Sequence, residues 1–373
     1  MKLLSSSLAV GALLIVAACS HNDGQGDATP VLDLSKNAEA VATAPIAVTD
    51  FTYAQLDGDT AAAFFKNAVI IDVTGDTAVL LEKDPMMTRI IMFDITTGKY
   101  LGDIDHRGQG PDEYRMILGA FVNDTDGTVL IPNFDTPAVY KYSLAADTLV
   151  TTLTREPVMS MIEPIGGVAS AINTAAMSPE GLSVIQYNGD YQLIDTLNVA
   201  GFTPGNFNIL WANAGVNGVM MVADTLYTLT PGLLQPTAIL SRGELAITPE
   251  KDIEITMQAM EGEDEIELLK PYILVRDVQF TDGKMLLTTM HNGQKYSDLY
   301  DLANGSLLYR STYNQLSTPN MIVVTGRDGK QIEIERLFAK NGKWYGIVNE
   351  DKAAELFGNT TTDSNCAIVT FSL

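Results

Sequence analysis

Histidine and cysteine are scarce in this chain of 373 residues, which has 3 histidines and 2 cysteines. The histidines are His21, His106 and His291, too few for a His-rich zinc site. Neither a Gly-x-Ser-x-Gly nucleophile elbow nor a His-Glu-x-x-His zinc motif occurs. We therefore expect no metal and no cofactor, and the sequence identifies no catalytic residue.

Basic residues are also few, with 23 Lys and Arg against 46 Asp and Glu and a net charge of −23 at pH 7. Surfaces that bind nucleic acid need clusters of Lys and Arg, because these neutralise phosphates. The composition therefore excludes nucleic acid as a partner and argues against adhesion to anionic lipid headgroups. The acidity fits solubility in a crowded envelope; the alternative is an acidic face for cations or basic partners.

Long hydrophobic runs are missing after the start of the chain. The run Leu8–Ala18 is shorter than the roughly 20 residues that a transmembrane helix needs. It follows Lys2 and is typical of a secretion signal, which we place at residues 1–18. The run ends in Val16-Ala17-Ala18-Cys19, which resembles the bacterial lipobox, in which the cysteine is acylated and becomes the new N-terminus. The alternative is an ordinary signal cut elsewhere, with Cys19 incidental.

The second cysteine, Cys366, has no disulfide partner if Cys19 carries lipid. A large secreted domain tolerates this because its core is large enough without a disulfide. Residues 19–45 are rich in small and polar residues, so we expect a flexible tether that holds the domain off the membrane. We predict a lipid-anchored protein of the cell envelope whose contact with the membrane is the lipid on Cys19. Ser20 favours the outer membrane, by resemblance to other lipoproteins.

Short apolar strands separated by polar turns dominate the rest of the chain. A second hairpin follows most copies of the first, most clearly at 89–104, where the turn lies at Gly98. The unit is thus four antiparallel strands repeated six times, which is the sequence pattern of a β-propeller. We predict an all-β fold over residues 46–373, a six-bladed β-propeller of four-stranded antiparallel blades. The first hairpins turn at glycines, which adopt positive φ without steric cost: Gly75, Gly127, Gly181, Gly218, Gly283 and Gly342.

The last unit ends one strand short. A ring with an incomplete last blade has an unpaired outer edge. We expect a strand at about Ile46–Tyr53 to supply the missing strand and so to join both ends of the chain within one blade. The alternative is an open blade of three strands.

Two segments depart from the strand pattern. Residues 248–270 contain a run of helix formers that begins at Thr248, before a proline, and stops at Pro271. This pattern predicts a helical insertion between the fourth and fifth blades. A shorter helix is expected at Thr60–Lys66, with Asp59 as its cap.

The segment 106–114, HRGQGPDEY, carries a family resemblance. Together with Phe93-Asp94 and Gly98-Lys99 before it, it resembles the Gly-x-Gly-Pro-(Gly)-Glu-(Tyr/Phe) signature and preceding hairpin of TolB-like, six-bladed β-propeller lipoproteins of Bacteroidetes. Asp112 stands where this signature usually has glycine. Elsewhere the resemblance is limited to repeat pattern and length. It implies the fold and the lipid anchor and contributes little on activity.

This segment has two interpretations. Its glycines and proline favour a sharp crossover between blades, in which Glu113 accepts backbone N–H bonds and Arg107 pairs with Asp112 or Glu113. Alternatively the loop contacts a ligand at the mouth of the ring, where the loops between blades converge. The loops at 133–135 and 291–292 either meet it there or are ordinary hairpin loops. The ligand-binding candidates are His106, Arg107, Glu113, Tyr114, Asn133, Asp135, His291 and Asn292.

Two functions fit these observations. We favour a binding or scaffold module whose loops at the ring mouth hold a peptide, glycan or protein partner. The alternative is a metal-dependent lyase or lactonase of the propeller type, with its metal at the ring mouth; the shortage of histidine counts against it. Convergence of His106, His291 and at least two carboxylates would favour the enzyme, whereas apolar and amide groups there would favour binding.

Overall fold

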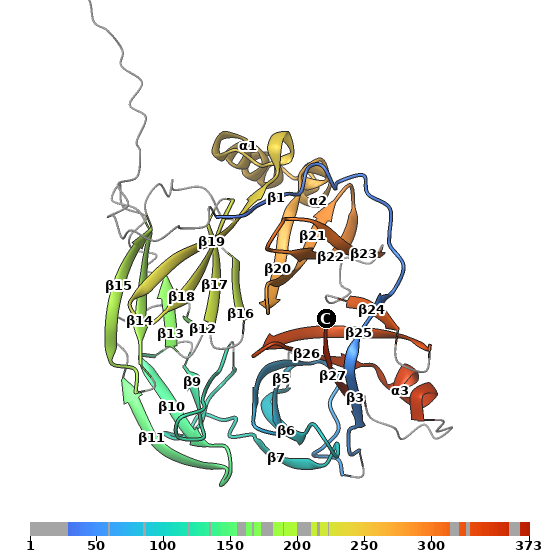
Figure 1. The fold of residues 1–373 in the computed structure, drawn as a ribbon. Helices are drawn as coiled ribbons and strands as arrows, with labels where there is room; N and C mark the ends of the chain where they lie inside the picture. The colour runs from blue at the N-terminus through green and yellow to red at the C-terminus, as the bar shows by residue number, and fades with distance from the viewer. Residues whose placement is uncertain are drawn as a thin grey trace, which may run out of the picture.

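The computed structural model describes residues 29–373 except 59, 85–86, 118, 134–135, 155–161, 166–167, 173–181, 189, 200–209, 215–216, 223, 314–320, 326–328 and 358–365. Strands predominate in the described residues, and their sheets stand side by side around a central axis (Figure 1). The chain is an all-β propeller with mostly four-stranded antiparallel blades and few helices.

Hydrogen bonding sorts the described strands into six sheets. The first two contain β4 (Ala68–Thr74), β5 (Thr77–Asp84), β6 (Met87–Asp94) and β7 (Tyr100–Ile104), then β8 (Phe121–Asn123), β9 (Thr128–Pro132), β10 (Ala138–Ser143) and β11 (Thr148–Thr154). The next two contain β12 (Ile162–Ile165), β13 (Val168–Ile172), β14 (Leu182–Tyr187) and β15 (Leu193–Val199), then β16 (Leu210–Ala214), β17 (Asn217–Val222), β18 (Thr225–Thr230) and β19 (Leu233–Ser241). The last two contain β20 (Leu274–Thr281), β21 (Lys284–His291), β22 (Gln294–Asp301) and β23 (Leu307–Tyr313), then β24 (Met321–Thr325), β25 (Gln331–Lys340), β26 (Lys343–Val348) and β27 (Ala367–Ser372).

One strand of each sheet lines the axis. Contacts run in succession through β4, β8, β12, β16, β20 and β25, and β25 contacts β4 again. Apolar clusters lie between neighbouring sheets, as where Leu286 of the fifth sheet packs with Ile334 and Trp344 of the last. Trp344 is 1% exposed. The fold is therefore stabilised by face-to-face packing of apolar strands from sheet to sheet.

The strand β3 (Thr49–Gln55) completes the last sheet, where it pairs antiparallel with β27. The expected closing strand is thus present, three residues further along than predicted at its start. Gly98 permits the close approach of β3 to the first sheet, because a Cβ there would lie 1.7 Å from the carbonyl oxygen of Gln55. Gly98 also has a φ of 74°, and its oxygen accepts a bond from the N–H of Asp57.

Residues 30–47, here called the N-terminal belt, lie across the outer edges of three sheets (Figure 1). Within the belt, β1 (Val31–Asp33) pairs parallel with β19, and β2 (Ile46–Ala47) pairs parallel with β24. Leu32 and Leu34 are buried in the core between the fourth and fifth sheets. The prediction of a flexible tether over residues 19–45 is therefore wrong for residues 29–45. These residues cover edge strands that would otherwise expose unpaired backbone groups.

In the described residues, three α-helices and the 3-10 helix Gly243–Leu245 interrupt the strand pattern. α1 (Pro249–Met260) and α2 (Glu265–Leu269) lie between β19 and β20, within the range 248–270 that the sequence singled out. The side chain of Thr248 accepts a bond from the N–H of Lys251 and caps α1, as its position before proline predicted. α3 (Glu350–Phe357) follows Asn349, whose side chain accepts the N–H of Lys352; the sequence interpretation missed this helix. No helix in the described ranges is both long enough and apolar enough to span a membrane.

Two local predictions were wrong. Thr60–Lys66 forms turns rather than a helix, and the side chain of Thr60 accepts the N–H of Ala63 within one turn; Asp59 lies outside the described residues. The strands on either side of Gly181, β13 and β14, are the second and third strands of their sheet rather than its first two. The short apolar strand β12 precedes them and was not recognised in the sequence.

Candidate functional site

The loop 106–114 connects β7 to β8 and is closed by its own backbone. The N–H of Gly108 donates to the backbone oxygen of Tyr114, and the N–H of Tyr114 donates to the backbone oxygen of His106. Both donor–acceptor distances are 3.0 Å. The carboxylate of Glu113 folds back and accepts the N–H of Gly110 at 2.8 Å. A Cβ at Gly108 would lie 1.7 Å from Oε2 of Glu113, so the glycine makes room for the carboxylate.

Tyr114 and Tyr142 fix this loop to the first two sheets. Tyr114 is fully buried, and its hydroxyl donates to the oxygen of Ile104 at 2.9 Å. The Tyr142 hydroxyl donates to the oxygen of Asp112 at 2.7 Å, and the two tyrosine rings meet edge to face. Burial raises the pKa of Tyr114 well above its usual value. This candidate is therefore part of the core.

The polar candidates His106 and Arg107 bind neighbouring carboxylates. Nε2 of His106 lies 2.8 Å from Asp147, and its ring stacks on Tyr142 with centroids 4.9 Å apart. Arg107 pairs with Asp105 at 2.5 and 2.7 Å, and the expected pairing with Asp112 or Glu113 stays a prediction. These contacts give the loop the geometry of a crossover between sheets.

The loop after β9 contributes one described candidate. Asn133 is 8% exposed, and its amide donates to the hydroxyl of Tyr140 at 3.2 Å. Asn133 thus packs against β10. Asp135 lies outside the described residues.

His291 and Asn292 form the turn between β21 and β22, beneath α2. His291 is 7% exposed, with Nδ1 3.4 Å from the oxygen of Tyr272 and Nε2 3.0 Å from the Asn292 amide. The N–H of Asn292 donates to the oxygen of Lys270 at 2.8 Å. Asn292 has a φ of 51°, a conformation that asparagine tolerates better than most residues. This turn therefore docks the end of α2 onto the fifth sheet.

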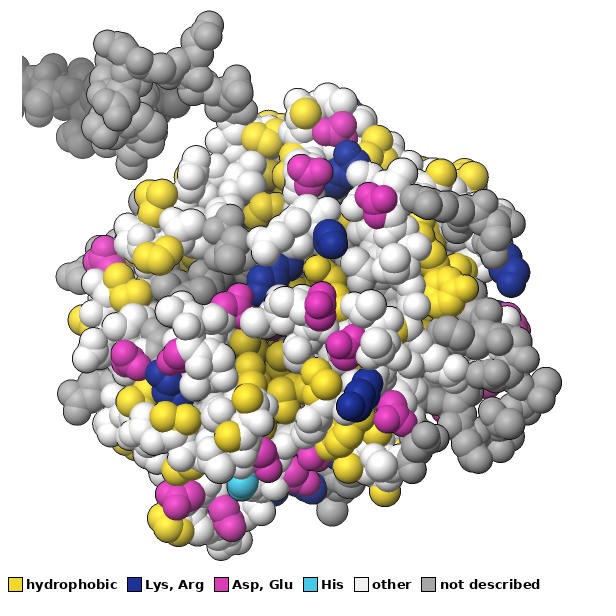
Figure 2. Space-filling model, turned by 60° about the horizontal axis from the view of Figure 1, so that its bottom comes forward, with side chains coloured by type: hydrophobic (Ala, Val, Ile, Leu, Met, Phe, Trp, Pro, Cys, Tyr) yellow, Lys and Arg dark blue, Asp and Glu magenta, His cyan; other side chains and the backbone are white. Residues whose placement is uncertain are grey.

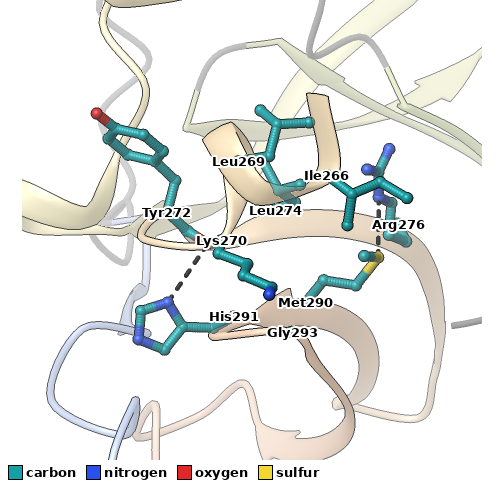
Figure 3. Close-up of a pocket in the computed structure, with 9 residues that line it drawn as sticks. All are labelled: Ile266, Leu269, Lys270, Tyr272, Leu274, Arg276, Met290, His291 and Gly293. Carbon is teal, nitrogen blue, oxygen red and sulfur yellow. Dashed lines mark hydrogen bonds between the residues drawn. The ribbon is translucent and has the colours of Figure 1, made fainter. Parts of the chain in front are cut away.

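A hollow lies between α2 and the strands β20 and β21 (Figure 3). It encloses about 30 Å³ and opens to the surface. The N-cap Asp264 accepts the N–H of Ile266 and sets the start of α2 above it. The lining is Ile266, Leu269, Lys270, Tyr272, Leu274, Arg276, Met290, His291 and Gly293.

His291 also lines a second, smaller hollow, on the side of the N-terminal belt. This second hollow is polar, because Arg310 and Asp298 form a buried ion pair in its wall. Burial raises the pKa of Asp298 despite the opposing effect of Arg310. Leu34 and Ala38 of the belt also line it. His291 thus lines both the hollow beside α2 and the smaller hollow beside the belt.

His106 and His291 do not meet. His106 lies in the loop after β7 and contacts Tyr142 and Asp147, whereas His291 ends β21 of the fifth sheet, and none of the polar partners described above is common to both. Within the part of the chain that the structure describes, no group of three or more His, Cys, Asp or Glu side chains could hold a metal. The convergence that would have favoured the metal-dependent enzyme is therefore not found in the described residues.

A charged cluster that sequence reasoning missed joins the first, second and last sheets. Nζ of Lys340 lies 2.6 Å from Asp72 and 2.8 Å from Asp124. Desolvation raises the pKa of Asp72 to about 6, against the opposing charge of Lys340. No sequence signal connects residues so far apart along the chain. The cluster lies where β25 and β4 meet and the ring of inner strands closes.

A family model described as "Domain of unknown function (DUF4934)" matches residues 47–369. The chain belongs to this family. No curated protein matches it. The DUF4934 match does not name the TolB-like family, so that resemblance stays a prediction.

Two solved structures share the fold. A candidate exported protein from Bacteroides fragilis aligns with a TM-score of 0.60 at 14% identity, over 87% of this chain and 95% of its own. A member of the duf4221 family from Bacteroides vulgatus aligns with a TM-score of 0.50 at 9% identity, over 88% of this chain and 97% of its own. At these identities the likeness shows the fold alone.

Proposed function

We propose that this DUF4934 protein is a lipid-anchored binding module of the cell envelope, which presents its helical segment to a protein partner. Acylated Cys19 attaches it to a membrane, the outer one by the lipoprotein resemblance. The six sheets act as six blades of one closed ring, and α1 and α2 are an insertion between the fourth and fifth. The rigid ring supports the recognition surface, and the belt joins that surface to the anchored end of the chain.

The observation that carries this proposal is an exposed apolar surface on the two helices, here called the apolar ridge. Its members are Ile253, Met257 and Met260 of α1 and Ile266 of α2, which are 54%, 57%, 84% and 51% exposed. The three α1 residues recur at helical spacing and so share one face. The opposite face is already used, since Ile255 packs with Leu274 against the propeller. Single exposed apolar side chains are normal on protein surfaces, but a group of them in one place marks an interaction site.

The charges around the ridge favour one kind of partner. Figure 1 shows α1 and α2 at the periphery, beside β19 and β20. A convex apolar helix with acidic flanks fits a protein groove that is apolar inside and lined by Lys and Arg at its rim. Such flanks disfavour an anionic membrane. In contrast, the face in Figure 2 intersperses acidic, basic and apolar side chains. The exposed acids of the helical segment are Glu250, Glu254, Glu261, Glu263, Asp264, Glu265 and Glu267.

The test compares a ridge variant with a matched control. The ridge variant is Met257→Glu with Met260→Glu; the control is Val150→Glu with Leu193→Glu, two apolar residues that are exposed on strands. Each tagged protein is used to capture partners from an envelope extract, and the captured protein is purified and titrated directly. We expect the ridge variant to bind it roughly thirtyfold more weakly, because two anchors are lost, and salt to weaken wild-type binding. Equal affinity of the purified partner for wild type and ridge variant would contradict the proposal.

A further inference from the structure

Arg276 lies at the rim of the hollow beside α2, and in the described part of the chain it forms no ion pair with an acidic side chain. Its Nε donates to the thioether sulfur of Met290 at 3.4 Å (Figure 3). A thioether is a weak acceptor, and no described carboxylate forms an ion pair with this guanidinium. Other arginines of the protein are used differently: Arg89, Arg107, Arg242 and Arg310 each bind a carboxylate. Arg276 is exposed, and its terminal nitrogens are open to an anion.

The floor of the hollow is apolar. Leu269, Leu274 and Met290 line it, and Ile266 lines it while also belonging to the apolar ridge. Its enclosed volume of about 30 Å³ accepts only a few atoms of a ligand. A short apolar group is the ligand chemistry that matches a small apolar floor.

Lys270 adds a second positive charge on the other side of the hollow. It pairs with Glu267 one turn earlier on α2, and its stem lies over Gly293, where a Cβ would be 3.2 Å from Cε of the lysine. Burial lowers the pKa of the nearby Lys295, and the charges of Asp277 and Arg276 act on that pKa in opposite directions. Of the two basic residues that line this hollow, Lys270 pairs with a described carboxylate and Arg276 does not.

We propose that this hollow binds a carboxylate that carries a short apolar group, as at the C-terminal residue of a peptide. The carboxylate is held by the guanidinium of Arg276, whose planar fork matches carboxylate geometry. The apolar group covers Leu269 and Met290. This inference rests on the proposed function, since the hollow adjoins the ridge at Ile266, and it names the chemistry that the partner offers there.

The experiment uses N-acetyl-L-leucine as the probe and N-acetyl-L-leucinamide as its uncharged match. Binding is followed by calorimetric titration at millimolar probe with wild type, Arg276→Gln and the control Arg336→Gln, whose guanidinium contacts Asn67 elsewhere. We expect wild type and control to bind the acid roughly tenfold more tightly than the amide, because the charge-assisted bond is lost in the amide. Arg276→Gln should remove this preference. Equal binding of acid and amide, equal binding by Arg276→Gln and wild type, or no binding of the acid would overturn the inference.

Two further probes distinguish the sources of such a carboxylate. A hexapeptide that ends in leucine represents a peptide terminus, and 4-methylpentanoate represents a free small acid. Tighter binding of either one supports the inference and identifies the source. The ridge test is independent, because Arg276→Gln leaves Met257 and Met260 in place. If Arg276→Gln changes nothing while the ridge variant loses its partner, this inference fails and the proposed function stands.

Discussion

The guanidinium of Arg310 and the carboxylate of Asp298 form a buried two-point ion pair beneath the N-terminal belt. Nε and Nη2 of Arg310 lie 2.7 and 2.6 Å from the two carboxylate oxygens, and the residues are 3% and 1% exposed. The remaining nitrogen, Nη1, donates to the backbone oxygens of Asn37 and Ala40 in the belt. The ring of Tyr296 lies 4.6 Å from the guanidinium carbon. One side chain thus joins the fifth sheet to the N-terminal segment.

This pair predicts a large loss of stability when one partner is removed. Arg310→Met should lower the free energy of unfolding by about 3–5 kcal/mol, because Asp298 is left charged and buried. Arg310→Lys should restore little of this, since lysine cannot make the two-point contact. Urea unfolding followed by circular dichroism measures the change. As a control, Lys251→Ala removes an exposed pair with Glu254 and should leave stability nearly unchanged, because water screens this pair. A loss below about 1 kcal/mol for Arg310→Met would contradict the role given to the pair.

The loop 106–114 predicts a coupled pair of substitutions. Gly108→Ala should lower stability by about 1–3 kcal/mol, because its Cβ would collide with the carboxylate of Glu113. In a protein that already carries Glu113→Ala, the stability cost of Gly108→Ala should be smaller by at least about 1 kcal/mol, because the collision is gone. Thermal unfolding of the four proteins of this cycle gives the coupling. Strictly additive costs would show that Glu113 is not what requires glycine at this position.

The charged cluster of Asp72, Asp124 and Lys340 predicts a pH dependence of stability. Desolvation raises the pKa of Asp72 from 3.8 to about 6. Between these values the folded protein binds more protons than the unfolded chain, so this group makes the free energy of unfolding fall as pH rises. The fall amounts to about 2 kcal/mol between pH 4 and 6. Relative to wild type, Asp72→Asn should therefore gain stability across this interval, with Glu254→Gln as a surface control. Urea unfolding at several pH values measures it, and parallel profiles for wild type and Asp72→Asn would refute the prediction.

Anchoring through Cys19 is tested by fractionation. Cys19→Ser should move the protein from the membrane fraction to the soluble fraction, because the residue that takes the lipid is gone. Immunoblots of the separated fractions measure this. Cys366→Ser serves as the matched control and should leave the protein with the membranes. A Cys19→Ser protein that still sediments with membranes would show that something other than this lipid holds it.

The sequence predicted the propeller because its strongest signals are local. Alternating apolar strands and glycine turns are recognised from residues that are close in sequence. The start of α1 is recognised in the same way, from Thr248 before a proline. The closing strand followed from counting strands in the last unit. α3 was missed, although Asn349 followed by helix formers offered a signal, because the region was interpreted only for strands.

The candidate site was predicted less well. The residues 106–114 were recognised as unusual, yet their polar groups bind within the loop and to Asp105 and Asp147. The sequence did not predict a role for Arg276, because an arginine on a strand carries no distinguishing pattern. It stands out only once the structure shows that its neighbour is a thioether rather than a carboxylate.

The sequence by itself determined the repeating four-stranded unit, the acidic surface and the positions of the main turns, since each depends on composition or spacing within a few residues. The tertiary structure decided the rest. Only there does residue 37 meet Arg310, or Asp72 meet Lys340, because closing a ring brings together residues more than 260 positions apart. The belt is the clearest case, because its polar composition predicted a free tether. In the structure, Leu32 and Leu34 are buried and β1 pairs with the edge strand β19, which holds the belt in place.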